Sequence, residues 1–62
     1  EEHLPVHVHV RNSDGRAKIR VQPEVTLIEN RGIKPNDVRK ALSLVALYKE
    51  QIIECWYEYF QG

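Results

Sequence analysis

Three histidines near the start of the chain are the side chains best suited to chemistry. His7 and His9 are separated by one residue, and His3 lies four positions before His7. On an extended segment, side chains two residues apart point to the same side, so His7 and His9 would share one face. Imidazole titrates near neutral pH and is the commonest metal ligand in proteins. The histidines could therefore cleave RNA by acid–base chemistry, or all three could bind a metal ion such as zinc.

A structural role for a histidine competes with both of these chemical roles. An imidazole can pack beside an aromatic side chain, and the sequence offers Trp56 and Tyr59 for this purpose. We favour this interpretation of His7 and His9. The sequence thus predicts no catalytic residue, no specific metal and no cofactor, and catalysis by His7 or His9 and metal binding by His3, His7 and His9 are kept as alternatives.

Basic side chains follow the histidines within ten residues and would lie on the same face. They are Arg11, Arg16, Lys18 and Arg20. The same stretch contains one acid, Asp14, although the whole chain balances nine Lys and Arg against nine Asp and Glu. Lysine and arginine bind nucleic acids by neutralising backbone phosphates. We predict a nucleic-acid-binding face here; the alternative is a solvated face whose charges limit aggregation.

Two strands must position these polar side chains. Val6, Val8 and Val10 alternate with the histidines, and an apolar residue likewise alternates with each base in residues 17–21. A period of two is typical of a half-buried strand. The stretch between them, residues 12–15, contains an Asp–Gly pair and predicts a hairpin turn.

The hairpin has two registers that keep the apolar and polar faces separate. A two-residue turn at Asp14 and Gly15 would place Val10 opposite Ile19, whereas a four-residue loop would place Val8 opposite Ile19. Pro23 cannot donate a backbone hydrogen bond and should end the second strand. Residues 25–29 are rich enough in β-branched side chains to form a short third strand, and residues 30–32 then turn the chain.

A helix is predicted for the remainder of the chain. Pro35 suits its first turn, and residues 37–59 contain neither glycine nor proline. Apolar residues recur at spacings of three and four, so one uninterrupted helix should cover the valine face. At 1.5 Å per residue, about 26 residues would span about 39 Å, so part of the helix should protrude. Four apolar residues lie off the main stripe and predict an interface with a second copy or a cognate protein: Leu44, Leu47, Ile53 and Phe60.

The fold class that follows is α+β, with an antiparallel hairpin and room for a third short strand packed on one long C-terminal helix. We expect residues 1–62 to form a single small domain. The one cysteine, Cys55, excludes an intrachain disulfide and should be a buried helix residue. No apolar stretch is long enough to span a membrane, so we expect a cytoplasmic protein.

Several short motifs, taken in order, resemble a small bacterial family catalogued as domain of unknown function 4160. These are His3-x-x-x-His7-Val8-His9-Val10, Ala17-Lys18, Glu29-Asn30-Arg31-Gly32 and Trp56-x-Glu58-Tyr59-Phe60. The resemblance covers essentially the whole chain. It implies a regulatory role or membership of a toxin–antitoxin-like gene pair, with no established reaction. Members usually carry a further N-terminal strand, which we expect to be missing from these 62 residues.

A weaker resemblance links the first half of the chain to toxins of the HicA type, which cleave messenger RNA. The stretch HVHVRNSDGRAKIRV followed by IKPNDVRKAL resembles their histidine strand, hairpin and proline-initiated helix. Our prediction is a non-enzymatic module that binds a protein partner, a nucleic acid or both. A small ribonuclease toxin using His7 or His9, or a histidine-based metal-binding module, is the alternative.

Overall fold

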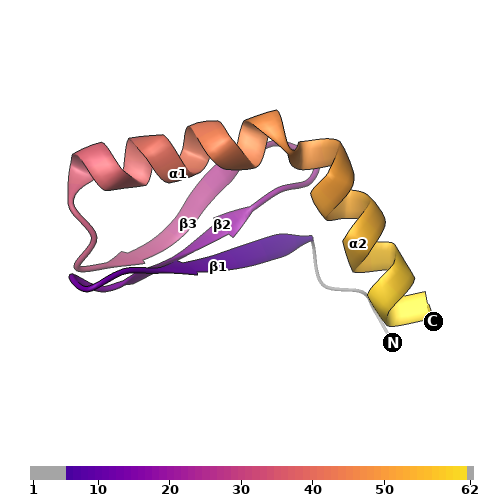
Figure 1. The fold of residues 1–62 in the computed structure, drawn as a ribbon, viewed down its shortest axis with the longest axis horizontal. Coiled ribbons are helices and arrows are strands. Elements are labelled where there is room, and N and C mark those ends of the chain that lie inside the picture. Colours follow the sequence, from indigo (N-terminus) through magenta and orange to yellow (C-terminus); the bar gives the residue numbers. More distant parts are fainter. Residues whose placement is uncertain (1–5, 62) are drawn as a thin grey trace.

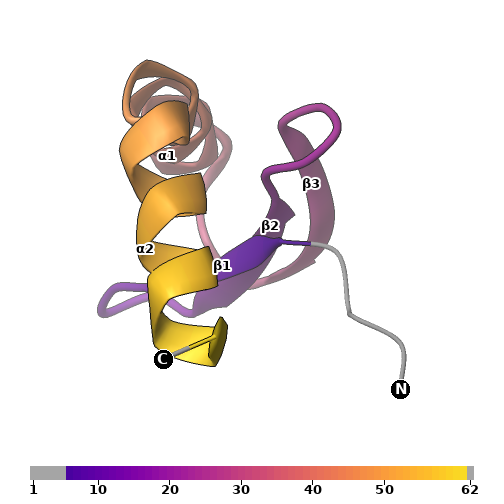
Figure 2. The same cartoon turned by 90° about the vertical axis from the view of Figure 1, so that its right-hand side faces the viewer.

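The computed structural model describes residues 6–61, with side chains described as far as Tyr59. Three strands, β1 (His7–Arg11), β2 (Arg16–Arg20) and β3 (Thr26–Arg31), precede two helices, α1 (Pro35–Leu47) and α2 (Lys49–Gln61). The strands form an antiparallel sheet in the order β1-β2-β3. Both helices lie on the same side of this sheet (Figures 1 and 2). The predicted α+β class and the third strand are confirmed.

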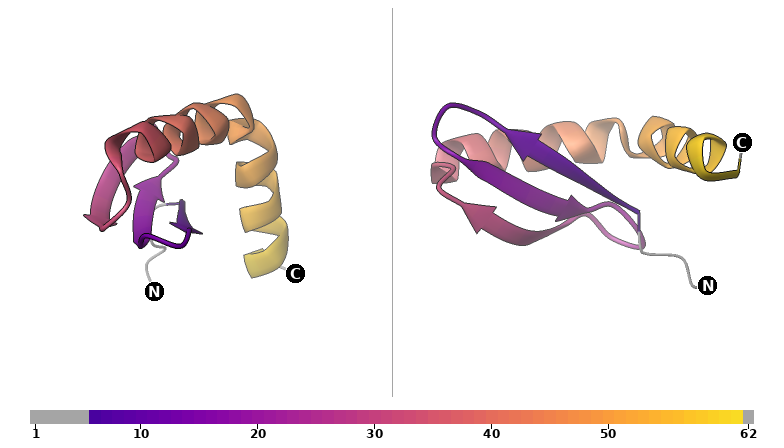
Figure 3. Two further views of the ribbon diagram at one scale, coloured as in Figure 1. Left: turned by 60° about the vertical axis from the view of Figure 1, so that its left-hand side comes forward. Right: turned by 90° about the horizontal axis from the view of Figure 1, so that it is seen from below.

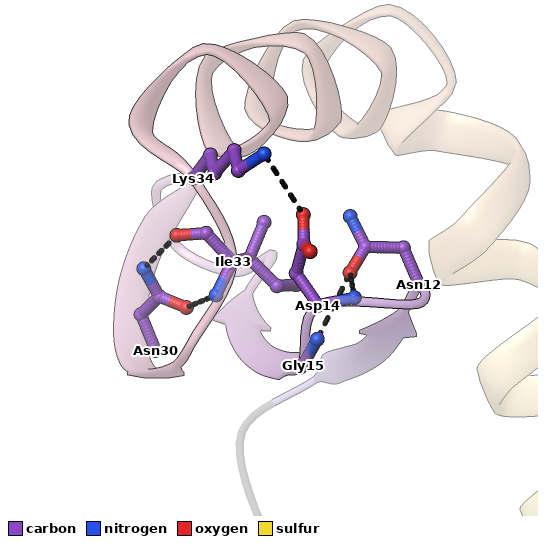
Figure 4. A network of polar contacts seen from close by, with 6 residues as sticks. All are labelled: Asn12, Asp14, Gly15, Asn30, Ile33 and Lys34. Atoms are coloured by element: carbon purple, nitrogen blue, oxygen red, sulfur yellow. Dashed lines mark hydrogen bonds and ion pairs between the residues drawn. The ribbon is translucent and has the colours of Figure 1, made fainter.

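The hairpin uses the longer of the two predicted loops. Val8 lies opposite Ile19 and His9 opposite Lys18, so the alternative with a two-residue turn is wrong. Asn12 explains the choice because its Oδ1 accepts hydrogen bonds from the backbone N–H groups of Asp14, at 2.9 Å, and Gly15, at 3.0 Å (Figure 4). An asparagine side chain that bonds its own loop in this way stabilises a turn without a left-handed residue.

Gly15 is needed for space. A Cβ atom at Gly15 would lie 1.9 Å from the carbonyl oxygen of Arg31, at the end of β3. The positive φ that the Asp–Gly pair suggested occurs instead at Gly32, where φ is 97°. The hairpin loop and the end of β3 are therefore in direct backbone contact.

Strand β3 is longer than predicted and contains a β-bulge. It continues to Arg31, two residues beyond the predicted end. The register places Ile19 opposite Leu27 but Lys18 opposite Glu29, so Ile28 is an extra residue in β3. The Asn30 side chain holds the turn that follows β3. Its Nδ2 donates to the Ile33 carbonyl at 2.9 Å, and its Oδ1 accepts from the Ile33 N–H at 3.0 Å (Figure 4).

The core lies between the inner face of the sheet and the helices. Ile19 and Val21 of the β2 region are fully buried. The other buried residues of the described chain come from the position just before β1, from β2, from the β3–α1 turn and from α1: Val6, Ala17, Ile33, Val38 and Val45. The valine and isoleucine face is thus the buried face, as the alternation predicted.

The prediction of one uninterrupted helix is wrong. Helix α1 ends at Leu47, Tyr48 has φ −104° and ψ 21°, and α2 begins at Lys49 (Figure 1). The bend has a packing cause, because it lets Ile52 and Trp56 reach the same core as α1. A straight helix would carry them past the sheet.

Two contacts with the β2–β3 loop accompany this bend. The Lys49 ammonium donates to the Pro23 carbonyl at 2.9 Å, and the Tyr57 hydroxyl lies 3.5 Å from Gln22 Oε1. No glycine or proline marks the position of the bend in the sequence. The molecule extends 34 × 24 × 18 Å, so no straight helix of 39 Å protrudes.

The predicted partner interface is divided by the bend. Leu44 and Leu47 are exposed, at 56% and 69% of their surface. Ile53 is half-buried and packs against the core, and its part in a partner interface stays a prediction. The Phe60 side chain lies outside the described part of the chain. Neither helix within residues 6–61 has the length and apolar character required to cross a membrane.

Candidate nucleic-acid interface

The outer face of the sheet carries the polar side chains that the sequence singled out. No described helix covers this face, which is turned toward the viewer on the right of Figure 3. The register arranges its residues in three rows across the strands: Arg11, Arg16 and Arg31; His9, Lys18 and Glu29; His7, Arg20 and Thr26. All four predicted basic residues and both described histidines are therefore brought together on one surface.

A shallow groove runs across the first two of these rows. Its polar lining consists of His9, Arg11, Arg16, Lys18, Glu29 and Arg31. Arg11 and Arg16 are exposed, and Lys18 is half-buried in the central strand. Arg20, in the third row, is held closer to the sheet, because its Nε atom is buried without a hydrogen-bond partner among the described residues. The most accessible cations thus lie toward the hairpin end of the sheet.

Arg31 is the groove residue that the sequence reasoning missed. Residues 30–32 were assigned to a turn, whereas β3 extends to Arg31 and places it opposite Arg16. The sequence does contain a sign of a longer strand, because Glu29 and Arg31 alternate with Asn30 in the period of two that strands show. The Asn–Arg–Gly sequence is also typical of a turn, and the turn was predicted instead.

Glu29 is the one acid on the outer face of the strands. Its Oε2 accepts a hydrogen bond from Arg31 Nε at 2.6 Å. This hydrogen bond and the positive charge of Arg31 lower the pKa of Glu29, and the charges of Lys18 and Arg16 act in the same direction. Glu29 therefore remains a carboxylate within the basic groove at neutral pH.

The two described histidines have different surroundings. The His7 ring lies edge-on to Trp56 with ring centroids 5.0 Å apart, and 5.3 Å from the His9 ring. The predicted packing of a histidine beside Trp56 is thus confirmed for His7, whereas His9 is exposed in the groove. Catalysis by either one stays an alternative to the prediction of no catalytic residue.

The metal alternative involves a residue that cannot be placed. His3 lies outside residues 6–61, and within that range no group of three or more His, Cys, Asp and Glu side chains is arranged to hold a metal ion. The positions of His7 and His9 therefore do not support a metal site formed by three histidines.

Comparison with known protein families gives one match. The model of one family, described as "Domain of unknown function (DUF4160)", matches residues 1–57. The chain belongs to the DUF4160 family. The resemblance that the ordered motifs suggested is confirmed, and the likeness to HicA-type toxins stays a prediction. No curated protein and no solved structure matches the chain.

The matched residues 1–57 include the whole basic face and all but one lining residue, Tyr59, of a second, apolar groove. This second groove lies between β1 and α2 and is lined by Val8, Gln51, Ile52, Cys55, Trp56 and Tyr59. The left view of Figure 3 shows α2 standing beside β1, which is one of the two edge strands of the described sheet. Cys55 is exposed here, so the prediction that it is buried is wrong; the bend at Tyr48 turns its side of the helix toward the groove.

Proposed function

We propose that this DUF4160 chain is a non-enzymatic bacterial module that binds nucleic acid through the outer face of its sheet. The observation that carries the proposal is the separation of charge. The outer face of the strands combines five basic side chains with the single acid Glu29, whereas the whole chain has a net charge of zero. The five are Arg11, Arg16, Lys18, Arg20 and Arg31.

Phosphate binding follows from the composition of this face. Arginine and lysine neutralise phosphates and release the counterions that surround a nucleic acid, which makes affinity fall with salt. A sheet face offers such residues in fixed rows, and His9 adds a further hydrogen-bonding group beside Lys18. The cytoplasm and a regulatory or toxin–antitoxin-like gene pair, as the family resemblance implies, are the setting of this proposal.

Removing the charges of β2 should test the proposal directly. Replacing Arg16, Lys18 and Arg20 by glutamine keeps most of each apolar side-chain stem, so the sheet should remain folded. We expect affinity for fluorescein-labelled 20-nucleotide DNA, single-stranded or duplex, to fall about tenfold or more in fluorescence anisotropy. The slope of log affinity against log salt should flatten by about two to three, from the loss of three phosphate contacts.

The matched control removes three charges elsewhere. Lys34, Arg39 and Lys40 are exposed residues at the start of α1 and within it, and their replacement by glutamine should change affinity much less. Equal losses in the two triple variants would show that net charge alone drives binding and would remove the outer face from the proposal.

A second candidate function is association with another protein chain, as a second copy or a cognate partner. The exposed Leu44 and Leu47 and the apolar groove beside the edge strand β1 favour it. A protruding helix does not support this candidate, because the chain bends at Tyr48. What supports this candidate is apolar surface left uncovered in a very small domain.

Leu47→Glu should reduce any self-association, because it places a charge on the most exposed leucine of the described helices. We expect the mass measured by light scattering at high protein concentration to fall toward 7.3 kDa, the mass of one chain. Ala46→Glu, at a neighbouring exposed position, is the control. A wild-type chain that is monomeric at the same concentration would reject self-association, leaving only a cognate partner.

A further inference from the structure

The outer face of the sheet is divided into two parts with different chemistry. Strands β1 and β2 present mainly cations to this face. Strand β3 presents Thr26, Ile28 and Glu29 before it ends at Arg31. An apolar side chain offers phosphate no hydrogen bond and a carboxylate repels it, so Ile28 and Glu29 should contact a different portion of a nucleic acid from the one that the cations contact.

The β-bulge creates the second part. Leu27 packs against the core, so alternation points Ile28 to the outer face, where it is 50% exposed. Without a bulge, Glu29 would then face inward. Because the register places Glu29 opposite Lys18, Ile28 and Glu29 both face outward and stand next to each other.

Glu29 is held in a form that accepts hydrogen bonds. Arg31 Nε donates to its Oε2, and a carboxylate has about four acceptor positions. A carboxylate repels phosphate but accepts a hydrogen bond from an exocyclic amino group, such as N4 of cytosine. Thymine and uracil have no such group.

The cations of β2 suit a backbone that runs along the strand. Arg16, Lys18 and Arg20 lie on the same face with about 6.6 Å between successive residues. With phosphates over β1 and β2, the bases of the same strand would extend toward β3. Bases are available to such a surface when they are unpaired, whereas a duplex exposes their edges only within its grooves.

On the basis of the proposed function, we propose that the outer face binds single-stranded nucleic acid and that Glu29 selects bases carrying an exocyclic amino group. The phosphates lie over β1 and β2, and the bases lie over β3. Ile28 contacts the apolar face of a base, and Glu29 Oε1 accepts the hydrogen bond from its amino group. Glu29 is thus a specificity-determining residue in a site otherwise built to bind phosphate.

Homopolymers test this inference with the intact chain. We expect fluorescein-labelled (dC)12 to bind about fivefold or more tightly than (dT)12, and more tightly than a (dC)12·(dG)12 duplex, in anisotropy titrations at fixed salt. In Glu29→Gln the affinity for (dT)12 should rise, because a negative charge is lost, while the preference for (dC)12 should fall below about twofold. The rise alone would follow from simple electrostatics, so the lost preference is the decisive measurement.

Glu54→Gln is the matched control, because Glu54 is an exposed acid on α2, and it should leave the base preference unchanged. Equal binding of (dC)12 and (dT)12 by the wild-type chain would overturn the role of Glu29. Binding of the duplex as tight as that of (dC)12 would overturn the choice of a single strand. If none of these DNAs binds, the proposed function itself is wrong, and that result is distinct from both of the others.

Discussion

Gly15→Ala is expected to destabilise the fold strongly. The added Cβ would lie 1.9 Å from the Arg31 carbonyl oxygen, 2.8 Å from the Arg31 carbonyl carbon and 2.9 Å from Gly32 Cα. All three atoms belong to the backbone, so no side chain can rotate to make room. The hairpin loop and the end of β3 would have to separate.

The free energy of unfolding should fall by about 1–3 kcal/mol or more, since about 1–3 kcal/mol is the typical cost of overpacking. A domain of this size has a free energy of unfolding of about 3–9 kcal/mol, so a large share of its stability is at risk. Thermal unfolding followed by circular dichroism should show a midpoint lower by about 10 °C or more. Ser13→Ala, an exposed position in the same loop, should shift the midpoint little; equal shifts would contradict the close approach of the two backbones.

Ile19→Ala is expected to have an effect of similar size for a different reason. Ile19 is fully buried in the central strand, and its side chain packs in the main core cluster with Val6, Val21 and Val45. Removing a buried isoleucine to alanine costs about 2–5 kcal/mol, because apolar contacts are lost and a cavity remains. Urea denaturation should show a lower midpoint with an unchanged slope.

Ile28→Ala makes the same chemical change on the opposite face of the sheet. Ile28 is half exposed at the bulge, so its truncation should cost less than about 1 kcal/mol. If the two variants lost the same stability, the assignment of inner and outer faces would be wrong, and the proposed binding surface would lose its basis.

The strands could be predicted from the sequence because their period of two places all the valines on one face, and that face must be the buried one. Either hairpin register gave the same faces, so the outer position of His9 and Lys18 did not depend on the turn. The register itself depended on the side chain of Asn12 and on the contact between Gly15 and β3. The second of these is a tertiary contact, which local turn preferences do not include.

The errors have a common physical cause, which is packing between elements distant in sequence. The bend at Tyr48 follows from the position of the sheet under α1 and from the contact of Lys49 with Pro23. The bulge at Ile28 moves Glu29 to the outer face and adds Arg31 to the groove. Neither a bend without glycine or proline nor a bulge within a β-branched stretch has a clear local signal.

The order of the strands also affects how the chain reaches its fold. Each strand pairs with the strand next to it in the sequence, so the connections to be closed are short and the entropy lost in closing them is small. Pairings between near neighbours are associated with rapid folding. The hairpin of β1 and β2 needs only a four-residue loop to close, so we expect it to pair early in folding and to be stabilised when α1 packs on its apolar face.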